Sequence, residues 1–320
     1  MTDLGPGVDR TRASGFPLVA LAAALWGTDA LFRRGLALEL PATTVVVWEH
    51  LILVVILLPV IVRIPWGRLT LADRWSLLLI GAGASAFATI LFTMSFRHGD
   101  PNTPLLLQKL QPVIAIVGAR LLLSERLRPR FGMYAACAVG AAWLITFPDP
   151  FDVQPSHLTA GLQAAGAAGL WAMGTVLGRR MTPVLTFVQL TAARVAIGLP
   201  AALLFVVFVP GRQATVVEHL RVDLGDLRAL LLLALVPGLA ALLLYYRGLR
   251  ATPASAATIA ELAFPVAALT VNYEAFGATL TGSQSLGVLV LSATLVVMSL
   301  RSTRSASELG VDVSRGPRGN

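Results

Sequence analysis

The chain has 320 residues, of which 56% are hydrophobic and only 13% are charged. Soluble domains carry about 25% charged residues, and here the apolar residues fall in long runs. A soluble protein is therefore excluded, and a polytopic membrane protein embedded in a lipid bilayer is predicted. The net charge of +8 does not indicate nucleic-acid binding, because the arginines lie at the ends of apolar runs and not on one polar face.

Residue types that bind metals or carry nucleophilic chemistry are scarce. Cys137 is the one cysteine and lies inside an apolar run, and the four histidines show no metal-binding spacing such as HExxH. The sequence also holds no Walker A motif. We therefore expect no metal, no cofactor and no direct use of ATP by this chain.

The apolar runs predict an all-α fold with ten transmembrane helices. They are too long and too continuous for the strands of a barrel, which alternate over about 10 residues. The first run looks like a signal peptide, but it reaches spanning length and has a copy later in the chain, so we expect it to be retained. The predicted spans cover residues 16–38, 43–63, 75–96, 103–124, 131–147, 158–178, 183–209, 227–249, 254–274 and 284–301.

Three pairs of short segments indicate an internal duplication. Two pairs are separated by 153 residues (226 − 73 and 265 − 112), and the pair around Trp26 and Trp171 by 145 (171 − 26). Five spans in each half place the two copies in opposite orientations, and such inverted repeats are typical of secondary transporters. The paired segments are 24–34 with 169–180, 73–79 with 226–232, and 110–113 with 263–266.

The repeat and the basic residues predict the domain organisation and the orientation. Sixteen arginines fall on the side of the two termini and six on the other side, among them Arg33 and Arg34. The positive-inside rule then places both termini in the cytoplasm and the protein in the inner (plasma) membrane. We expect a cytoplasmic tail (1–15), two five-helix repeats (16–147 and 158–301), a linker (148–157) and a disordered cytoplasmic tail (302–320).

The predicted fourth span carries polar residues that membrane helices rarely hold. Gln108, Lys109, Gln111 and Pro112 lie in its first half. A lysine there costs about 2.5–3.5 kcal/mol on insertion scales, so it needs a partner, water or a function. Proline removes a helix hydrogen bond, and Pro265 is the repeat counterpart of Pro112, so we expect both prolines to act as kinks or hinges.

This order of polar residues, a Leu-x-Pro at 110–112, an apolar run and a Glu-Arg-Leu at 125–127 resembles the fourth helix of the EamA group of the drug/metabolite transporter superfamily. With the Trp-Gly of the first span and the weaker second copy, the resemblance runs over residues 16–301. It implies a secondary transporter and not an enzyme, exporting amino acids, other small metabolites or drug-like compounds. The chain departs from the family at 48–50, where Trp-Glu-His replaces an arginine that is usual in span two.

Five polar residues from three spans fall at similar depth in the outer half of the membrane. They are Asp29, Glu49, His50, Gln108 and Lys109. Charges at such depth usually pair or face a water-filled cavity, so they predict a substrate site in which Asp29 or Glu49 neutralises Lys109. The alternatives are a structural ion pair that fastens helices and, for His50, a hydrogen-bonded packing residue.

The second half supplies further candidates for the cavity. Glu261 aligns with Gln108 at the separation of 153 residues, and Arg194 is its expected partner. The candidates for proton coupling are Glu49, Asp29 and Glu261. The remaining predicted cavity residues are Trp26, Gln111, Trp171, Tyr245 and Tyr246, of which the aromatic residues have interfacial anchoring or packing as the alternative.

These features favour a secondary transporter that moves a small-molecule substrate by alternating access. An integral-membrane enzyme would need a nucleophile–base set, a metal cluster or paired catalytic acids, and Glu49-His50 alone is a weak signal of that kind. A membrane sensor or scaffold would need neither the duplication nor the charges inside the spans. Since one chain supplies both halves of the cavity, we expect the monomer to be the working unit.

Overall fold

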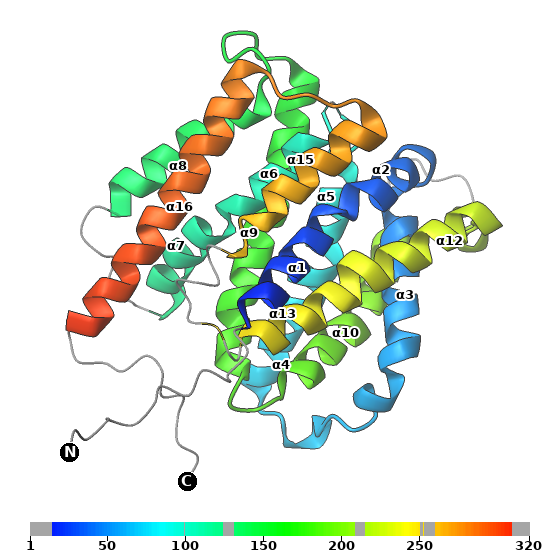
Figure 1. Cartoon of the computed structure of the whole chain (residues 1–320). Coiled ribbons are helices and arrows are strands. Elements are labelled where there is room, and N and C mark those ends of the chain that lie inside the picture. The colour runs from blue at the N-terminus through cyan, green and yellow to red at the C-terminus, as the bar shows by residue number, and fades with distance from the viewer. Residues whose placement is uncertain are drawn as a thin grey trace, which may run out of the picture.

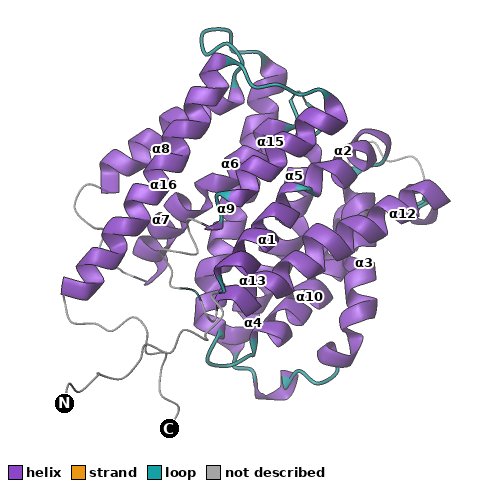
Figure 2. Cartoon of the chain, in the orientation of Figure 1, coloured by secondary structure: helices purple, strands orange, loops and turns teal. Residues whose placement is uncertain are grey.

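The computed structural model describes residues 15–98, 100–123, 131–208, 215–249, 252 and 260–308. Every regular element among them is helical, which confirms the all-α prediction for this part of the chain (Figure 2). The helices of the first half are α1 (Phe16–Gly27), α2 (Asp29–Glu39), α3 (Ala42–Ile61), η1 (Trp66–Arg68), α4 (Leu71–Leu78), η2 (Leu79–Phe87), α5 (Ala88–Ser95), α6 (Asn102–Leu107), η3 (Gln108–Leu110), α7 (Gln111–Leu123) and α8 (Phe131–Thr146). Those of the second half are α9 (Pro155–Met181), α10 (Phe187–Val207), α11 (Val216–His219), α12 (Leu224–Leu233), η4 (Ala234–Ala240), α13 (Ala241–Leu249), α15 (Ala263–Phe276) and α16 (Gly282–Glu308).

Six helical stretches in the described residues are long and apolar enough to cross a membrane. They are Phe16–Glu39, Ala42–Ile61, Leu71–Ser95, Pro155–Gly178, Phe187–Val207 and Leu224–Gly248. Two shorter apolar helices, Phe131–Thr146 and Gly282–Met298, match two further predicted spans. Of the predicted span 103–124, the described residues up to 123 form α6, η3 and α7. Of the predicted span 254–274, residues 254–259 lie outside the described residues, and α15 covers the part from Ala263 onward. At the end of the chain, α16 continues to Glu308 and so enters the segment predicted as a disordered tail.

Local features recur at the separations that the sequence repeat predicts. The segments η2 and η4 are both π-helical and end at Phe87 and Ala240, 153 residues apart (240 − 87). The helices that lead into them start with capping boxes at Thr70 and Asp223, again 153 residues apart (223 − 70). In a capping box the side chain of the first residue and a side chain three residues later satisfy each other's backbone N–H groups. These matches fit a two-repeat architecture.

The predicted fourth span is broken where its polar residues lie. Helix α6 ends before a 3₁₀ turn at Gln108–Leu110, and α7 resumes at Gln111, whose N–H donates to the carbonyl of Gln108. Proline at position 112 has no N–H to donate to that carbonyl, which lies four residues earlier, so regular α-helical bonding cannot pass this point.

The corresponding position in the second half is interrupted in the same way. A turn at Glu261 and Leu262 precedes α15, and Phe264 N–H donates to the carbonyl of Glu261 at 3.1 Å. Glu261 lies four residues before Pro265 and 153 residues after Gln108 (261 − 108). The two prolines thus stand next to two equivalent breaks.

The helices pack in groups that Figure 1 shows side by side. Helix α1 lies against α13 and α15, α3 against α10, and α8 against α16. The connections α8–α9 and α15–α16 lie at one end of the bundle, at the top of Figure 1, and the α3–α4 turn lies at the opposite end. Helix α1 therefore contacts two helices of the other half.

Gly27 allows α1 to approach α15 closely. A Cβ atom at this position would lie 2.8 Å from the carbonyl oxygen of Phe264 and 2.8 Å from the backbone nitrogen of Ala268. Both are backbone atoms, which cannot move aside as a side-chain tip can. Gly35, on the exposed side of α2, has nothing within 4 Å of the same position.

We predict opposite effects of one substitution at these two glycines. Gly27→Ala should lower the free energy of unfolding by about 1–3 kcal/mol through overpacking of α1 against α15. Gly35→Ala should raise it by up to about 1 kcal/mol, because alanine is the better helix former. Melting temperatures of the two variants in the same detergent measure this difference, and equal melting temperatures would refute the close approach of α1 and α15.

Candidate functional site

The most highly connected charge in the described residues is Arg33 on α2, which is only 3% exposed. It donates to Asp29 at 2.7 and 3.0 Å, one helical turn earlier. It also donates to Glu49 of α3 at 3.2 and 3.4 Å and to Thr93 of α5 at 2.9 Å. We call these four residues the Arg33 cluster. It joins three helices of the first half through one guanidinium group.

The Arg33 cluster corrects two expectations from the sequence. Arg33, which the charge count assigned to the outer side, is buried among three helices. The second correction concerns Lys109, whose expected partners Asp29 and Glu49 face Arg33 instead. The signal that was missed is the spacing of Asp29 and Arg33, since residues four apart on a helix are neighbours and an Asp–Arg pair is stabilising there.

Lys109 lies in the 3₁₀ turn that breaks the fourth span, next to an aromatic ring of the other half. Its ammonium nitrogen is 4.2 Å from the centre of the Phe264 ring, a cation–π contact. Glu261 is the acid that acts on it electrostatically. No carboxylate of the described residues lies within 4.0 Å of the ammonium group. The cation at the first break therefore meets the aromatic ring that follows the second break.

Glu261 is held by a tyrosine and not by the arginine expected from the sequence. Tyr245 of α13 donates its hydroxyl hydrogen to Glu261 Oε1 at 2.7 Å. The ring of Tyr245 packs against Trp26 of α1, with 5.0 Å between the ring centres. Glu261, Tyr245 and Trp26, with Lys109 and Phe264, form what we call the break cluster. It brings together α1, α13 and the two helix breaks.

Arg194 of α10 lies in a separate network. Its Nη2 donates to the carbonyl of Ala84 at 3.1 Å and its Nε to the Ser85 hydroxyl oxygen at 3.3 Å. Ser85 also lies 2.9 Å from Nε2 of His50, whose Nδ1 is 2.9 Å from the carbonyl of Val46. His50 is thus buried, and both of its ring nitrogens lie within hydrogen-bonding distance of a partner. Both bonds of Arg194 run to the π-helical segment η2.

Arg194 and Glu49 are separated by a spacing that also occurs in the sequence repeat, and they interact electrostatically. They are 145 residues apart (194 − 49), the same separation as Trp26 and Trp171. Glu49 acts electrostatically on Arg194.

The other residues predicted for the cavity are placed as follows. The ring of Trp171 packs at a steep angle against the ring of Phe92, with 5.1 Å between the ring centres. The guanidinium carbon of Arg33 lies 5.4 Å from the centre of the same Phe92 ring. Tyr246 packs against Phe187 and Tyr245. Gln108 and Gln111 are partly buried at the break, whereas Pro112 is exposed.

A polar contact between the halves was not foreseen. Asn272 of α15 donates to Asn102 of α6 at 2.7 Å, and the two residues are 0% and 1% exposed. Beside them Gln284 of α16 donates to Asp100 at 3.1 Å. Burial raises the pKa of the Asp100 carboxyl above its usual range. These bonds close the end of the bundle drawn at the top of Figure 1.

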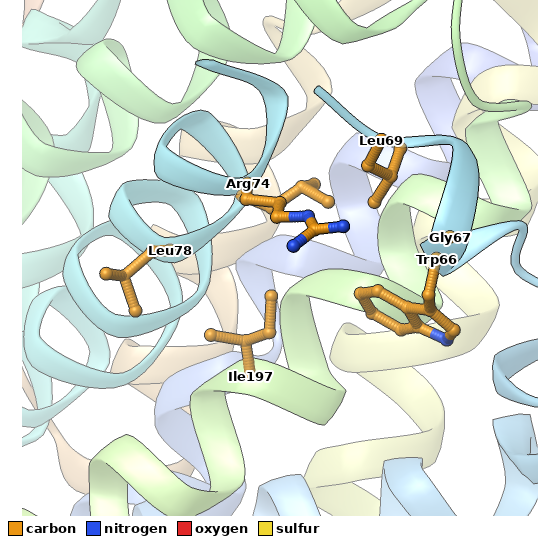
Figure 3. Close-up of a pocket in the computed structure, with 7 residues that line it drawn as sticks. Trp66, Gly67, Leu69, Arg74, Leu78 and Ile197 are labelled. Atoms are coloured by element: carbon orange, nitrogen blue, oxygen red, sulfur yellow. The ribbon is translucent and has the colours of Figure 1, made fainter. Parts of the chain in front are cut away.

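The pocket shown in Figure 3 lies elsewhere, between the α3–α4 turn and α10. None of the residues that line it is one of the candidates predicted from the sequence. For the substrate site, the half-buried charges at the helix breaks are a stronger indication than this pocket, because charge inside a membrane is costly and is usually retained for a task.

The fold and these buried charges define a multi-pass membrane protein. Its family follows from sequence similarity: the profile of the EamA-like transporter family matches residues 13–147 and 158–300, and the chain belongs to this family. The resemblance noted in the sequence is thereby confirmed.

Two individual proteins are also similar to the chain. The riboflavin transporter ImpX of Fusobacterium nucleatum subsp. nucleatum is 31% identical over 183 residues, which are 51% of this chain and 58% of that protein. The match thus spans little more than half of that relative. A crystal structure of another protein has a TM-score of 0.57 at 19% identity and covers 91% of this chain and 98% of its own, which shows likeness of fold alone.

Proposed function

We propose that the chain is a secondary transporter that moves a small metabolite across the cytoplasmic membrane by alternating access. The observation that carries this proposal is the pair of helix breaks at Gln108–Leu110 and Glu261–Leu262. Irregular backbone inside a membrane is tolerated where it is buried in protein or lines a cavity, and transporters bind substrates at such discontinuous helices. A cation at one break and an acid at the other supply groups that a substrate can contact.

The break cluster also supports a substrate class. Lys109 and Glu261 present opposite charges beside the rings of Trp26, Tyr245 and Phe264. A positive charge at one break and a negative charge at the other suit a zwitterion such as an amino acid. The aromatic rings equally suit a planar ring system, and the riboflavin transporter among the relatives makes a flavin the second candidate. We propose export as the direction of transport, on the basis of the family resemblance.

We further propose that protons drive the transport through the Arg33 cluster. Asp29 and Glu49 share the single guanidinium of Arg33, so the cluster holds one acid more than it holds bases. A carboxylate in excess at a buried site is a natural place for a proton to bind and leave. Glu261, held by the neutral hydroxyl of Tyr245, is the second candidate for this role.

The proton proposal predicts a change in the pH profile of transport. Glu49→Gln should flatten the pH dependence of the flux, because the excess acid is removed while the side chain keeps its size. Initial rates in proteoliposomes, with pH varied on one side, measure this. Glu39→Gln on the exposed end of α2 is the control and should keep the wild-type profile; a pH profile unchanged in Glu49→Gln would place the proton site elsewhere.

The organisation predicted from the sequence completes the proposal. We place the two five-helix repeats at 16–147 and 158–301 in inverted orientation, both termini in the cytoplasm, and the monomer as the working unit. Removing the buried Arg33 from the six outer arginines leaves five (6 − 1), which strengthens the charge asymmetry toward the cytoplasmic side. A dimer whose disruption abolishes flux would contradict the monomer.

A thermal-shift screen of the purified protein tests the substrate proposal. A ligand that binds only the folded state at 100 times its Kd stabilises it by about 2.7 kcal/mol. The panel holds riboflavin, flavin mononucleotide, amino acids, polyamines, nucleobases and cationic drugs. The expected result is a shift for a zwitterion or a flavin that is absent in Lys109→Ala. A shift of equal size in wild type and Lys109→Ala would place the binding site away from the break cluster.

A further inference from the structure

A pocket of about 530 Å³ lies beside the turn that joins α3 and α4, a size within the roughly 300–1,000 Å³ of known ligand sites (Figure 3). Its walls are almost entirely apolar. Leu69 and Leu77 are buried in them, and the ring of Trp66 is fixed by a hydrogen bond from its indole nitrogen to the carbonyl of Ile61 at 3.2 Å. The remaining lining residues are Gly67, Arg74, Leu78 and Ile197.

Arg74 is the one charged residue that lines this pocket. Figure 3 shows its guanidinium directed into the space between Trp66, Leu69 and Ile197. No carboxylate of the described residues lies within 4.0 Å of this group. The pocket therefore presents a cation without an acid partner, and an anion is the group that complements it.

The position of the pocket indicates where such an anion comes from. Arg74 lies in the first turn of the apolar stretch Leu71–Ser95, at the boundary between a span and a connecting turn. Trp66 and Trp75 are 37% and 58% exposed beside it, and tryptophan is enriched at the interface between membrane and water. Further along the helix from Arg74, toward the middle of the span, the apolar side chains of Leu78 and Leu79 are exposed.

We propose that this pocket binds an anionic phospholipid. The phosphate of the headgroup would pair with Arg74, and the acyl chains would lie along the exposed leucines of α4 and η2. A free phosphate ion shares the charge but finds apolar walls where it needs hydrogen-bond donors. Basic pockets between membrane helices are known to hold anionic headgroups. The proposal is independent of the substrate site.

Native mass spectrometry of the full chain, released from detergent that contains dioleoyl phosphatidylglycerol or dioleoyl phosphatidylcholine, tests this site. The wild-type protein should retain one phosphatidylglycerol in preference to phosphatidylcholine, and Arg74→Gln should weaken that retention about fivefold. Arg74→Lys keeps the charge and should keep most of the preference. Arg68→Gln changes a neighbouring exposed arginine outside the pocket and should leave it unchanged.

Three results would overturn the proposal. The first is equal retention of the two lipids by the wild-type protein. The second is a loss in Arg68→Gln as large as that in Arg74→Gln, which would show attraction to the basic end of the bundle without a site. Retention of inorganic phosphate in place of the lipid, lost in Arg74→Gln, would identify an anion pocket of another kind and would equally contradict the lipid.

Discussion

Replacing Arg33 with glutamine is expected to lower the free energy of unfolding by about 3–5 kcal/mol, the cost of removing one partner from a buried ion pair. Two carboxylates, Asp29 and Glu49, would then face each other without a cation, and the hydroxyl of Thr93 would lose its donor. Because three helices meet at this guanidinium, the whole first half should loosen. The melting temperature and the folded yield in detergent measure the effect.

The matched control for this prediction is Arg97→Gln, which changes an exposed arginine near the same end of the bundle. It should leave the melting temperature unchanged. The triple variant Asp29→Asn, Arg33→Gln, Glu49→Gln should regain most of the lost stability, because no charge remains unpaired. Arg33→Gln with wild-type stability would show that the Arg33 cluster does not hold the helices together.

Replacing Lys109 with methionine is expected to reduce substrate flux by roughly 10- to 100-fold, the loss that follows when a hydrogen bond worth about 1.5–3 kcal/mol to a charged group is removed. Methionine keeps the length of the side chain and its contact with the Phe264 ring, so the fold should persist. The lysine has no acid within 4.0 Å in the described residues, which leaves its charge available to a substrate.

Arg120→Gln is the matched control for the Lys109 prediction. Arg120 lies on α7, in the same predicted span, but is exposed. Flux and melting temperature of both variants are compared with wild type after reconstitution into liposomes. Normal flux in Lys109→Met would reduce this lysine to a structural role, and a collapse of its melting temperature would mean that its interaction with Glu261 fastens the helices.

The helical class, the break at the fourth span and several candidate residues could be predicted because they depend on local chemistry. A lysine inside an apolar run and a proline three residues later are visible in the sequence, and the proline cannot pair the carbonyl four residues before it. The capping boxes at Thr70 and Asp223 follow the same local logic. Such features need no knowledge of neighbouring helices.

The pairing of charges could not be predicted, because it depends on how helices pack. Lys109, Glu49 and Arg194 lie on different helices, and depth alone did not tell which acid faces which base. Arg33 was counted with the outer charges because it lies near the outer end of the predicted span 16–38, whereas its burial depends on the packing of α2 against Glu49 of α3 and Thr93 of α5. The contact of Asn102 with Asn272 joins residues 170 apart (272 − 102) and left no local signal.

The central claim is that substrate binds at the two helix breaks. Its most direct test uses Gln108→Cys in a Cys137→Ala background, labelled with a membrane-permeant maleimide with and without the ligand that the thermal-shift screen identifies. Bound substrate should slow the labelling of Gln108→Cys at least fivefold and should not slow that of Val117→Cys, on the exposed side of α7. Equal labelling rates with and without a saturating ligand at Gln108→Cys would contradict the claim and place the binding site elsewhere in the bundle.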